Sequence, residues 1–165
     1  MKKSPALILG LLYLFFFGCL ARSSSQLPSR VATHFDGSGR PNGWMSRTDH
    51  LRFMTVFGLG FPLFVPALIY ACRLLPDRYY NLPHRDYWLA PARRTESMAY
   101  LLRHSLWFSS IALCFVIGIH FLIIQANNLA QAHLSSLLVL AVAGCFLGGT
   151  AIWGASMMRH FNHVP

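Results

Sequence analysis

The chain has 165 residues, of which 55% are hydrophobic and 12% charged, and its mean hydropathy is +0.44. These values exclude an ordinary soluble domain. The net charge is +9, but the basic residues flank apolar runs instead of gathering on one surface, so we expect membrane lipid as a partner and no nucleic acid. Four apolar runs have nearly the number of residues that a helix needs to cross a bilayer. We therefore predict an all-α integral membrane protein, a single domain over residues 1–165 that folds as a four-helix transmembrane bundle.

The first apolar run covers residues 5–21, between a pair of lysines and Arg22. A cleaved signal peptide has the same basic start followed by a short apolar core, so this segment has two possible interpretations. Three consecutive phenylalanines, Phe15 to Phe17, bring the run close to spanning length. That length favours a retained helix over a signal peptide.

Residues 22–50 form a polar segment rich in Gly, Pro, Ser, Asn and Asp. This composition predicts an irregular loop. The segment also contains apolar residues, among them Phe35 and Trp44, which a free linker would not need. We therefore predict that the loop is ordered and packs on the helix ends, with Phe35 facing inward and His34 and Asp36 facing outward.

The other three spans are expected at residues 51–72, 106–125 and 136–158. Pro62 and Pro66 fall inside the second span. Each proline removes a backbone donor and crowds the preceding turn of a helix. The second span is therefore predicted to be kinked or broken.

Basic residues are distributed unequally between the two sides of the predicted bundle. Nine of the 14 lie on the side of the two termini and of residues 73–102, and the other five lie on the side of residues 22–50. Because the side richer in Lys and Arg is usually cytoplasmic, we predict both termini inside and residues 22–50 outside. In the inner connection, Thr95 followed by Glu96 is expected to cap the N-terminus of the third helix.

Two motifs stand in these connections. The outer loop contains Thr33, His34, Phe35, Asp36, Gly39, Pro41 and Gly43, and the inner connection contains Asn81, Pro83, Tyr87, Trp88, Pro91, Arg93 and Arg94. Together they resemble the signature of a family of bacterial membrane domains of unknown function, the one found at the N-terminus of SdpI-like (sporulation-delaying-protein immunity) proteins. The resemblance covers about the first two thirds of the chain and implies a small multi-pass protein of the bacterial cytoplasmic membrane. Longer members carry further helices that this chain lacks, so immunity or signalling is not transferred.

His34 and Asp36 are two residues apart, so an extended backbone would point both side chains to one side. They could then share a metal ion, a proton or a ligand, with Asp49 and His50 as neighbouring ligands. The spacing matches no established metal motif, including the calcium loop of the EF-hand. A structural role in the loop is favoured, and we expect neither a metal nor a cofactor.

Aromatic and basic residues of the inner motif, Tyr87, Trp88, Arg93 and Arg94, suit either an anionic lipid head group or a partner protein. A segment that merely returns to the membrane surface has the same composition. The second interpretation is favoured.

His120 falls within the third span, where an ionisable side chain is costly unless it faces protein or water. We predict that it points into the bundle and is neutral at pH 7. Its partner could be a backbone carbonyl freed by Pro62 or Pro66, or the hydroxyl of Thr150. A packing role is favoured over a proton relay.

Small residues recur on the fourth span at Gly144, Gly148, Ala151 and Ala155, separated by four, three and four residues. Such a stripe lets two helices approach closely. We expect it to pack against another span of the same chain, with a homo-oligomer as the alternative.

Two classes of function remain open. The leading hypothesis is a non-enzymatic membrane protein, which acts as a sensor, an immunity-like factor or an accessory subunit and contacts a peptide or protein through its outer loop. The alternative is a membrane enzyme or transporter that uses His34, Asp36 or His120 for metal or proton chemistry.

Overall fold

The structure is a computed structural model that describes residues 4–164. Its four long helices are α1 (Pro5–Gln26), α2 (Arg47–Cys72), α4 (Arg94–Asn127) and α5 (Ser136–Asn162). The strands β1 (Arg30–Phe35) and β2 (Pro41–Ser46) lie between α1 and α2, and the short helices η1 (Asp77–Tyr79) and α3 (Arg85–Trp88) lie between α2 and α4. All four long helices are long and apolar enough to cross a membrane, so the prediction of a four-helix membrane bundle is confirmed.

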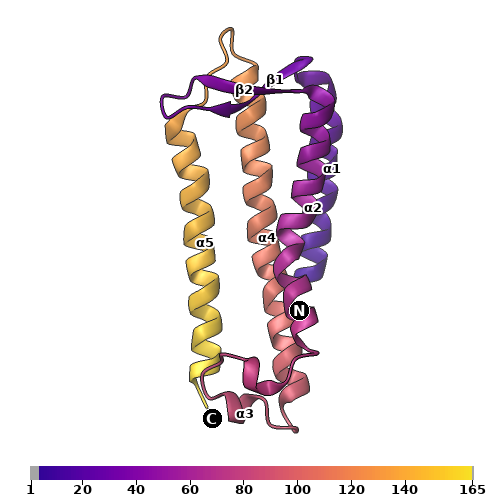
Figure 1. The fold of residues 1–165 in the computed structure, drawn as a ribbon, viewed down its shortest axis with the longest axis vertical. Coiled ribbons are helices and arrows are strands. Elements are labelled where there is room, and N and C mark those ends of the chain that lie inside the picture. The colour runs from indigo at the N-terminus through magenta and orange to yellow at the C-terminus, as the bar shows by residue number, and fades with distance from the viewer. Residues whose placement is uncertain (1–3, 165) are drawn as a thin grey trace.

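The strands form a hairpin across one end of the bundle, which we call the hairpin end (Figure 1). The connection from α2 to α4 covers the opposite, or cap, end, where the chain also finishes. The predicted irregular loop is therefore wrong in its local structure. β1 contains Val31, Thr33 and Phe35, the β-branched and aromatic residues that strands favour, whereas β2 has only Trp44 of this kind and pairs with β1 through its backbone.

The helices extend beyond the predicted spans into the polar connections. α1 continues to Gln26, and the hydroxyls of Ser23, Ser24 and Ser25 donate to carbonyls three residues earlier in the same helix. α4 begins at Arg94 rather than at 106. Hydropathy identifies only the apolar part of a membrane helix, so it does not predict the polar turns at the ends of the helix.

Thr95 does not cap α4, contrary to the prediction. The residue at the N-cap is Arg93, whose side chain makes no capping bond. The backbone instead enters the helix through a turn, in which the amides of Arg93 and Arg94 donate to the carbonyl of Ala90.

α2 is continuous through both of its prolines, so the predicted break is absent. A proline cannot donate to the carbonyl four residues before it, which leaves the carbonyls of Gly58 and Pro62 without a partner in their own helix. The Tyr13 hydroxyl of α1 donates to the Gly58 carbonyl at 3.3 Å, and the Ser109 hydroxyl of α4 donates to the Pro62 carbonyl at 2.7 Å. Neighbouring helices thus satisfy both freed carbonyls, as the apolar bilayer requires.

α4 is the central helix and packs against α1, α2 and α5. The largest cluster of buried side chains lies between α1, α2 and α4. The Phe16 ring, which is fully buried, lies directly against the backbone of α2 at Gly58. A side chain at position 58 would overlap that ring, so this close approach depends on glycine.

α5 stands apart from the other helices and packs mainly on α4 (Figure 1). Large aromatic side chains make that contact: the ring centroids of Phe115 and Phe146 lie 4.7 Å apart, and those of Phe108 and Trp153 lie 5.1 Å apart. On one side of this contact a groove of about 640 Å³ separates α5 from α1.

The stripe of small residues on α5 does not pack within the chain, and that prediction is wrong. Gly144, Gly148, Ala151 and Ala155 are all exposed, and a Cβ atom at Gly144 or Gly148 would meet no atom of residues 4–164 within 4 Å. The aromatic residues define the contact face because they have the larger area to bury. A homo-oligomer through the stripe stays an untested expectation.

Candidate functional site on the hairpin

The hairpin turn is organised by Asp36. Its Oδ1 atom accepts hydrogen bonds from the Ser38 amide at 2.9 Å, the Ser38 hydroxyl at 2.7 Å and the Arg40 amide at 2.9 Å. These donors stabilise the ionised carboxylate and hold the pKa of Asp36 below its ordinary value. Asp36 therefore has a structural role in the turn, even though its side chain faces outward as predicted.

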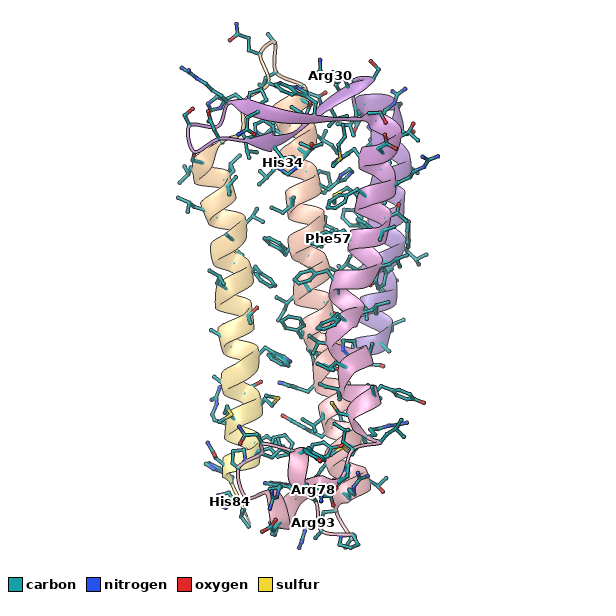
Figure 2. The ribbon with its side chains drawn as sticks, viewed as in Figure 1. Arg30, His34, Phe57, Arg78, His84 and Arg93 are labelled. Atoms are coloured by element: carbon teal, nitrogen blue, oxygen red, sulfur yellow. The ribbon has the colours of Figure 1, made fainter. Side chains whose placement is uncertain are left out.

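Two motif glycines are needed for the shape of the hairpin. Gly39 has a φ of +81°, a left-handed conformation that favours glycine, and a Cβ atom there would overlap the Leu134 carbonyl. Gly43 pairs with His34, and a Cβ atom at Gly43 would lie 2.9 Å from that of His34. The space at Gly43 accommodates the His34 side chain, which is exposed at the hairpin end (Figure 2).

The hairpin is docked on the bundle through β1. The Asn127 side chain of α4 accepts from the Ala32 amide at 2.8 Å and donates to the Ala32 carbonyl at 2.9 Å. Below it, Val31 and Leu27 are buried against the end of α4, and Phe35 packs on the same cluster. The prediction that this segment packs on the bundle with Phe35 inward is confirmed.

The tip of the hairpin is fastened to the connection between α4 and α5. There the Leu134 amide donates to the Gly39 carbonyl at 2.9 Å. At its other end the hairpin runs straight into α2, where Ser46 is the N-cap and its hydroxyl accepts from the Asp49 amide. The hairpin thus bridges the ends of all the long helices.

The four candidate metal ligands do not converge. Asp49 accepts a hydrogen bond from the Ser46 hydroxyl at 2.6 Å and pairs with Arg52 at 3.5 Å. His50 is buried in the bundle, away from the exposed His34 and Asp36. Across residues 4–164 there is no group of three or more His, Cys, Asp or Glu side chains positioned around a common metal position.

His120 is fully buried and points into the bundle, as predicted. Its Nε2 atom lies 3.0 Å from the Ser23 hydroxyl of α1, and its ring centroid lies 5.6 Å from that of His50 on α2. The predicted partners are wrong, because Ser109 occupies the carbonyl freed by Pro66 and Thr150 lacks a hydrogen-bond partner among residues 4–164. The nearby Nδ1 of His120 and Nε2 of His50 also lack one within the described part of the chain.

The inner motif forms the cap. The Trp88 indole donates to the Phe161 carbonyl of α5 at 2.9 Å, and the Trp88 carbonyl accepts from the Ser97 hydroxyl of α4 at 2.8 Å. Arg94 pairs with Asp77 at 3.0 Å, whereas Arg93 lies over the Tyr87 ring and is exposed at this end (Figure 2). Of the other motif residues, Asn81 and Pro91 are exposed and Pro83 is partly buried.

Sequence reasoning missed the residues that join the elements. Asn127 is absent from the predicted site residues, and so is the pairing of His50 with His120. A polar side chain in the last turn of a membrane helix, beneath a loop that must dock, is the signal that could have indicated Asn127. The pairing of the two histidines depends on helix rotation, which a single sequence does not give.

A four-helix membrane bundle, with a docked hairpin at one end and a folded cap at the other, defines the class of this protein as a small multi-pass membrane protein. Residues 8–59 match the family model described as "Domain of unknown function (DUF1648)", which is the family that the two motifs predicted. The match covers most of α1, the hairpin and the first half of α2, and it does not include the inner motif. Neither the curated proteins nor the solved structures contain a significant match.

Proposed function

We propose that this protein is a non-enzymatic membrane protein, a sensor, an immunity-like factor or an accessory subunit, whose hairpin binds a peptide or protein outside the cytoplasm. The observation that carries the proposal is the docking of the hairpin. It is fixed to α4 by Asn127 and to the α4–α5 connection through Gly39. A rigid element that presents exposed residues such as His34 and Trp44 is suited to recognition, because little conformational entropy is lost on binding.

The orientation supports the proposal. The cap end carries more basic residues than the hairpin end, and such a bias favours a cytoplasmic cap and an extracytoplasmic hairpin. The resemblance of the two motifs to SdpI-like proteins agrees with an extracytoplasmic partner.

Photo-crosslinking in native membranes tests the proposal. A photoreactive amino acid at His34 should give a discrete protein adduct, and the same residue at Ala92, which is exposed on the cap, serves as the matched control. An adduct from position 34 that is absent from position 92 supports recognition at the hairpin. Identical adducts at both positions, or lipid adducts alone, would contradict it.

A second candidate function is proton transport or proton-coupled chemistry, and it is supported by the buried pair of His50 and His120. Ionisable groups inside a membrane bundle are often part of proton pathways. Proton flux into liposomes that contain the protein would be measured with a pH-sensitive dye. Flux that is lost in His120→Gln, but kept in Ser23→Ala, would favour this function, and no flux above empty liposomes would dismiss it.

A further inference from the structure

The two edges of the hairpin differ. In an antiparallel pair, residues that face each other alternate between pairs that exchange hydrogen bonds and pairs whose amides and carbonyls point outward. Both backbone groups of Ala32 are bound by the Asn127 side chain, which lies on the side away from β2. The pair of Ala32 with Trp44 is therefore of the outward type.

The same alternation fixes the neighbouring positions. The Arg47 amide donates to the Ser29 carbonyl, so the backbone groups of this pair point toward each other. Bonded pairs recur at every second residue of an antiparallel pair. Val31 and Met45, two residues further into the hairpin on each strand, are therefore the next bonded pair. Trp44 lies between the bonded positions, so its amide and carbonyl point to the outer edge of β2.

Asn127 thus occupies the edge of β1 at Ala32, whereas within residues 4–164 no side chain or backbone group binds the outward amide or carbonyl of Trp44 on β2. Among the helices and strands of residues 4–164, β2 makes substantial contact with β1 and with α2, the helix that follows it in the chain. Asn42, Trp44 and Ser46 are exposed along β2. An open strand edge of this kind is a template for a further extended chain.

We propose that the β2 edge binds an extended acidic peptide segment of another protein as a third strand, with the backbone groups of Trp44 at the centre of the pairing. The inference deepens the proposed function and rests on it. Main-chain pairing provides affinity, and the exposed ring of Trp44, which the Arg30 guanidinium overlies at 5.0 Å, provides a surface for a side chain of the partner.

Charge decides between the possible occupants. Residues 22–52 carry five arginines and two aspartates. One aspartate, Asp36, is used by the turn, and the other, Asp49, pairs with Arg52. A second copy of this chain would bring the same excess of positive charge to the edge, which disfavours pairing, whereas an acidic strand is complementary.

The test uses the full chain in nanodiscs and two blocked peptides, one alternating glutamate with threonine and one alternating lysine with threonine. The acidic peptide should bind saturably and slow hydrogen exchange at the Trp44 amide at least tenfold, while exchange at Val31 is unchanged. The lysine peptide should do neither. N-methylation of the acidic peptide along one edge should abolish binding.

Two variants separate backbone pairing from side-chain contact. Trp44→Pro removes the indole ring and, among the backbone groups, only an outward amide, whose loss an edge strand tolerates. The hairpin should therefore remain folded while peptide binding is lost. Trp44→Thr keeps the amide and should still show protection with weaker binding. Protection at Val31 reports in each case that the hairpin is intact.

Several results would overturn the inference. Peptide binding without protection of the Trp44 amide would exclude strand addition. It would not contradict recognition of a partner by the hairpin, which the crosslinking experiment tests separately. Equal binding of the lysine peptide would exclude an acidic partner. Trp44 protection that rises with protein density in the absence of peptide would assign the edge to a second copy, and no binding of either peptide would exclude the proposed site.

Discussion

The Asn127 carboxamide of α4 pairs with both backbone groups of Ala32, at 2.8 Å and 2.9 Å, in the way that a neighbouring strand would. Asn127→Ala should therefore leave a partly buried amide and carbonyl unpaired and destabilise the docked hairpin by about 1–3 kcal/mol. Hydrogen exchange at Ala32 and at Val31, whose side chain is buried between β1 and α4, measures the effect.

Asn128→Ala is the matched control for this change. Asn128 is the next residue and is exposed, so its loss should leave exchange at Ala32 unchanged. Equal effects of the two substitutions would show that docking does not depend on the carboxamide pairing.

Ser109→Ala should destabilise the bundle because it leaves the Pro62 carbonyl without a donor. Hydrogen bonds between membrane helices average about 0.6 kcal/mol and reach about 1.7 kcal/mol, which sets the expected loss. In a Pro66→Ala background the restored amide can reach the same carbonyl, so Ser109→Ala should cost less there. Equal losses in the two backgrounds, measured by unfolding in mixed detergent, would contradict the role assigned to Ser109.

Gly58 and Gly60 form a matched pair on α2. A Cβ atom at Gly58 would overlap the Phe16 ring, whereas one at Gly60 would meet nothing within 4 Å. Gly58→Ala is expected to lower the free energy of unfolding by about 1–3 kcal/mol through overpacking. Gly60→Ala should be neutral or stabilising by up to about 1 kcal/mol, because alanine is the better helix former.

Asp36 gives the hairpin turn a dependence on pH. Its pKa in the folded protein is below the ordinary value of 3.8. The stabilising effect of the ionised carboxylate is therefore complete above that ordinary value and is lost as the pH falls through the folded pKa. Exchange at the Ser38 amide, corrected for its intrinsic pH dependence, should lose protection below about pH 4, and Asp36→Asn should abolish this transition.

The orientation can be tested with single cysteines in a background in which Cys19, Cys72, Cys114 and Cys145 are replaced. Ser38 lies in the hairpin turn and Thr95 lies at the start of α4, and both are exposed. A membrane-impermeant thiol reagent applied to intact cells should label Ser38→Cys and not Thr95→Cys. Labelling of position 95 without permeabilisation would contradict the predicted topology.

The sequence predicts best what depends on summed hydropathy. Four apolar runs were sufficient to predict four membrane helices, because a bilayer demands a minimum apolar length. The hairpin could not be predicted from composition, since Gly, Pro and Asp mark turns whether or not the flanking residues pair. The outward direction of His34 followed correctly from alternation, but the burial of His50 did not, since it depends on how α2 is rotated toward α4.

The stripe of small residues shows a different limit. Gly144 and Gly148 fit a close-packing pattern, yet they face away from α4, which meets Phe146 and Trp153 instead. A single sequence gives the faces of a helix but not which face has a neighbour. The face of α5 that contacts α4 also depends on the side chains that α4 presents to it.

α5 is attached to the rest of the protein by a hydrogen bond at each of its ends. At one end the Leu134 amide, just before the helix, is tied to Gly39 in the hairpin, and at the other the Phe161 carbonyl is tied to the Trp88 indole of the cap. Between these ties α5 has α4 on one side and an open groove toward α1. Because Phe146 and Trp153 also hold its middle against α4, α5 cannot slide along α4 on its own. A change in bilayer thickness must then be met by a tilt of the whole bundle or by the lipid around it.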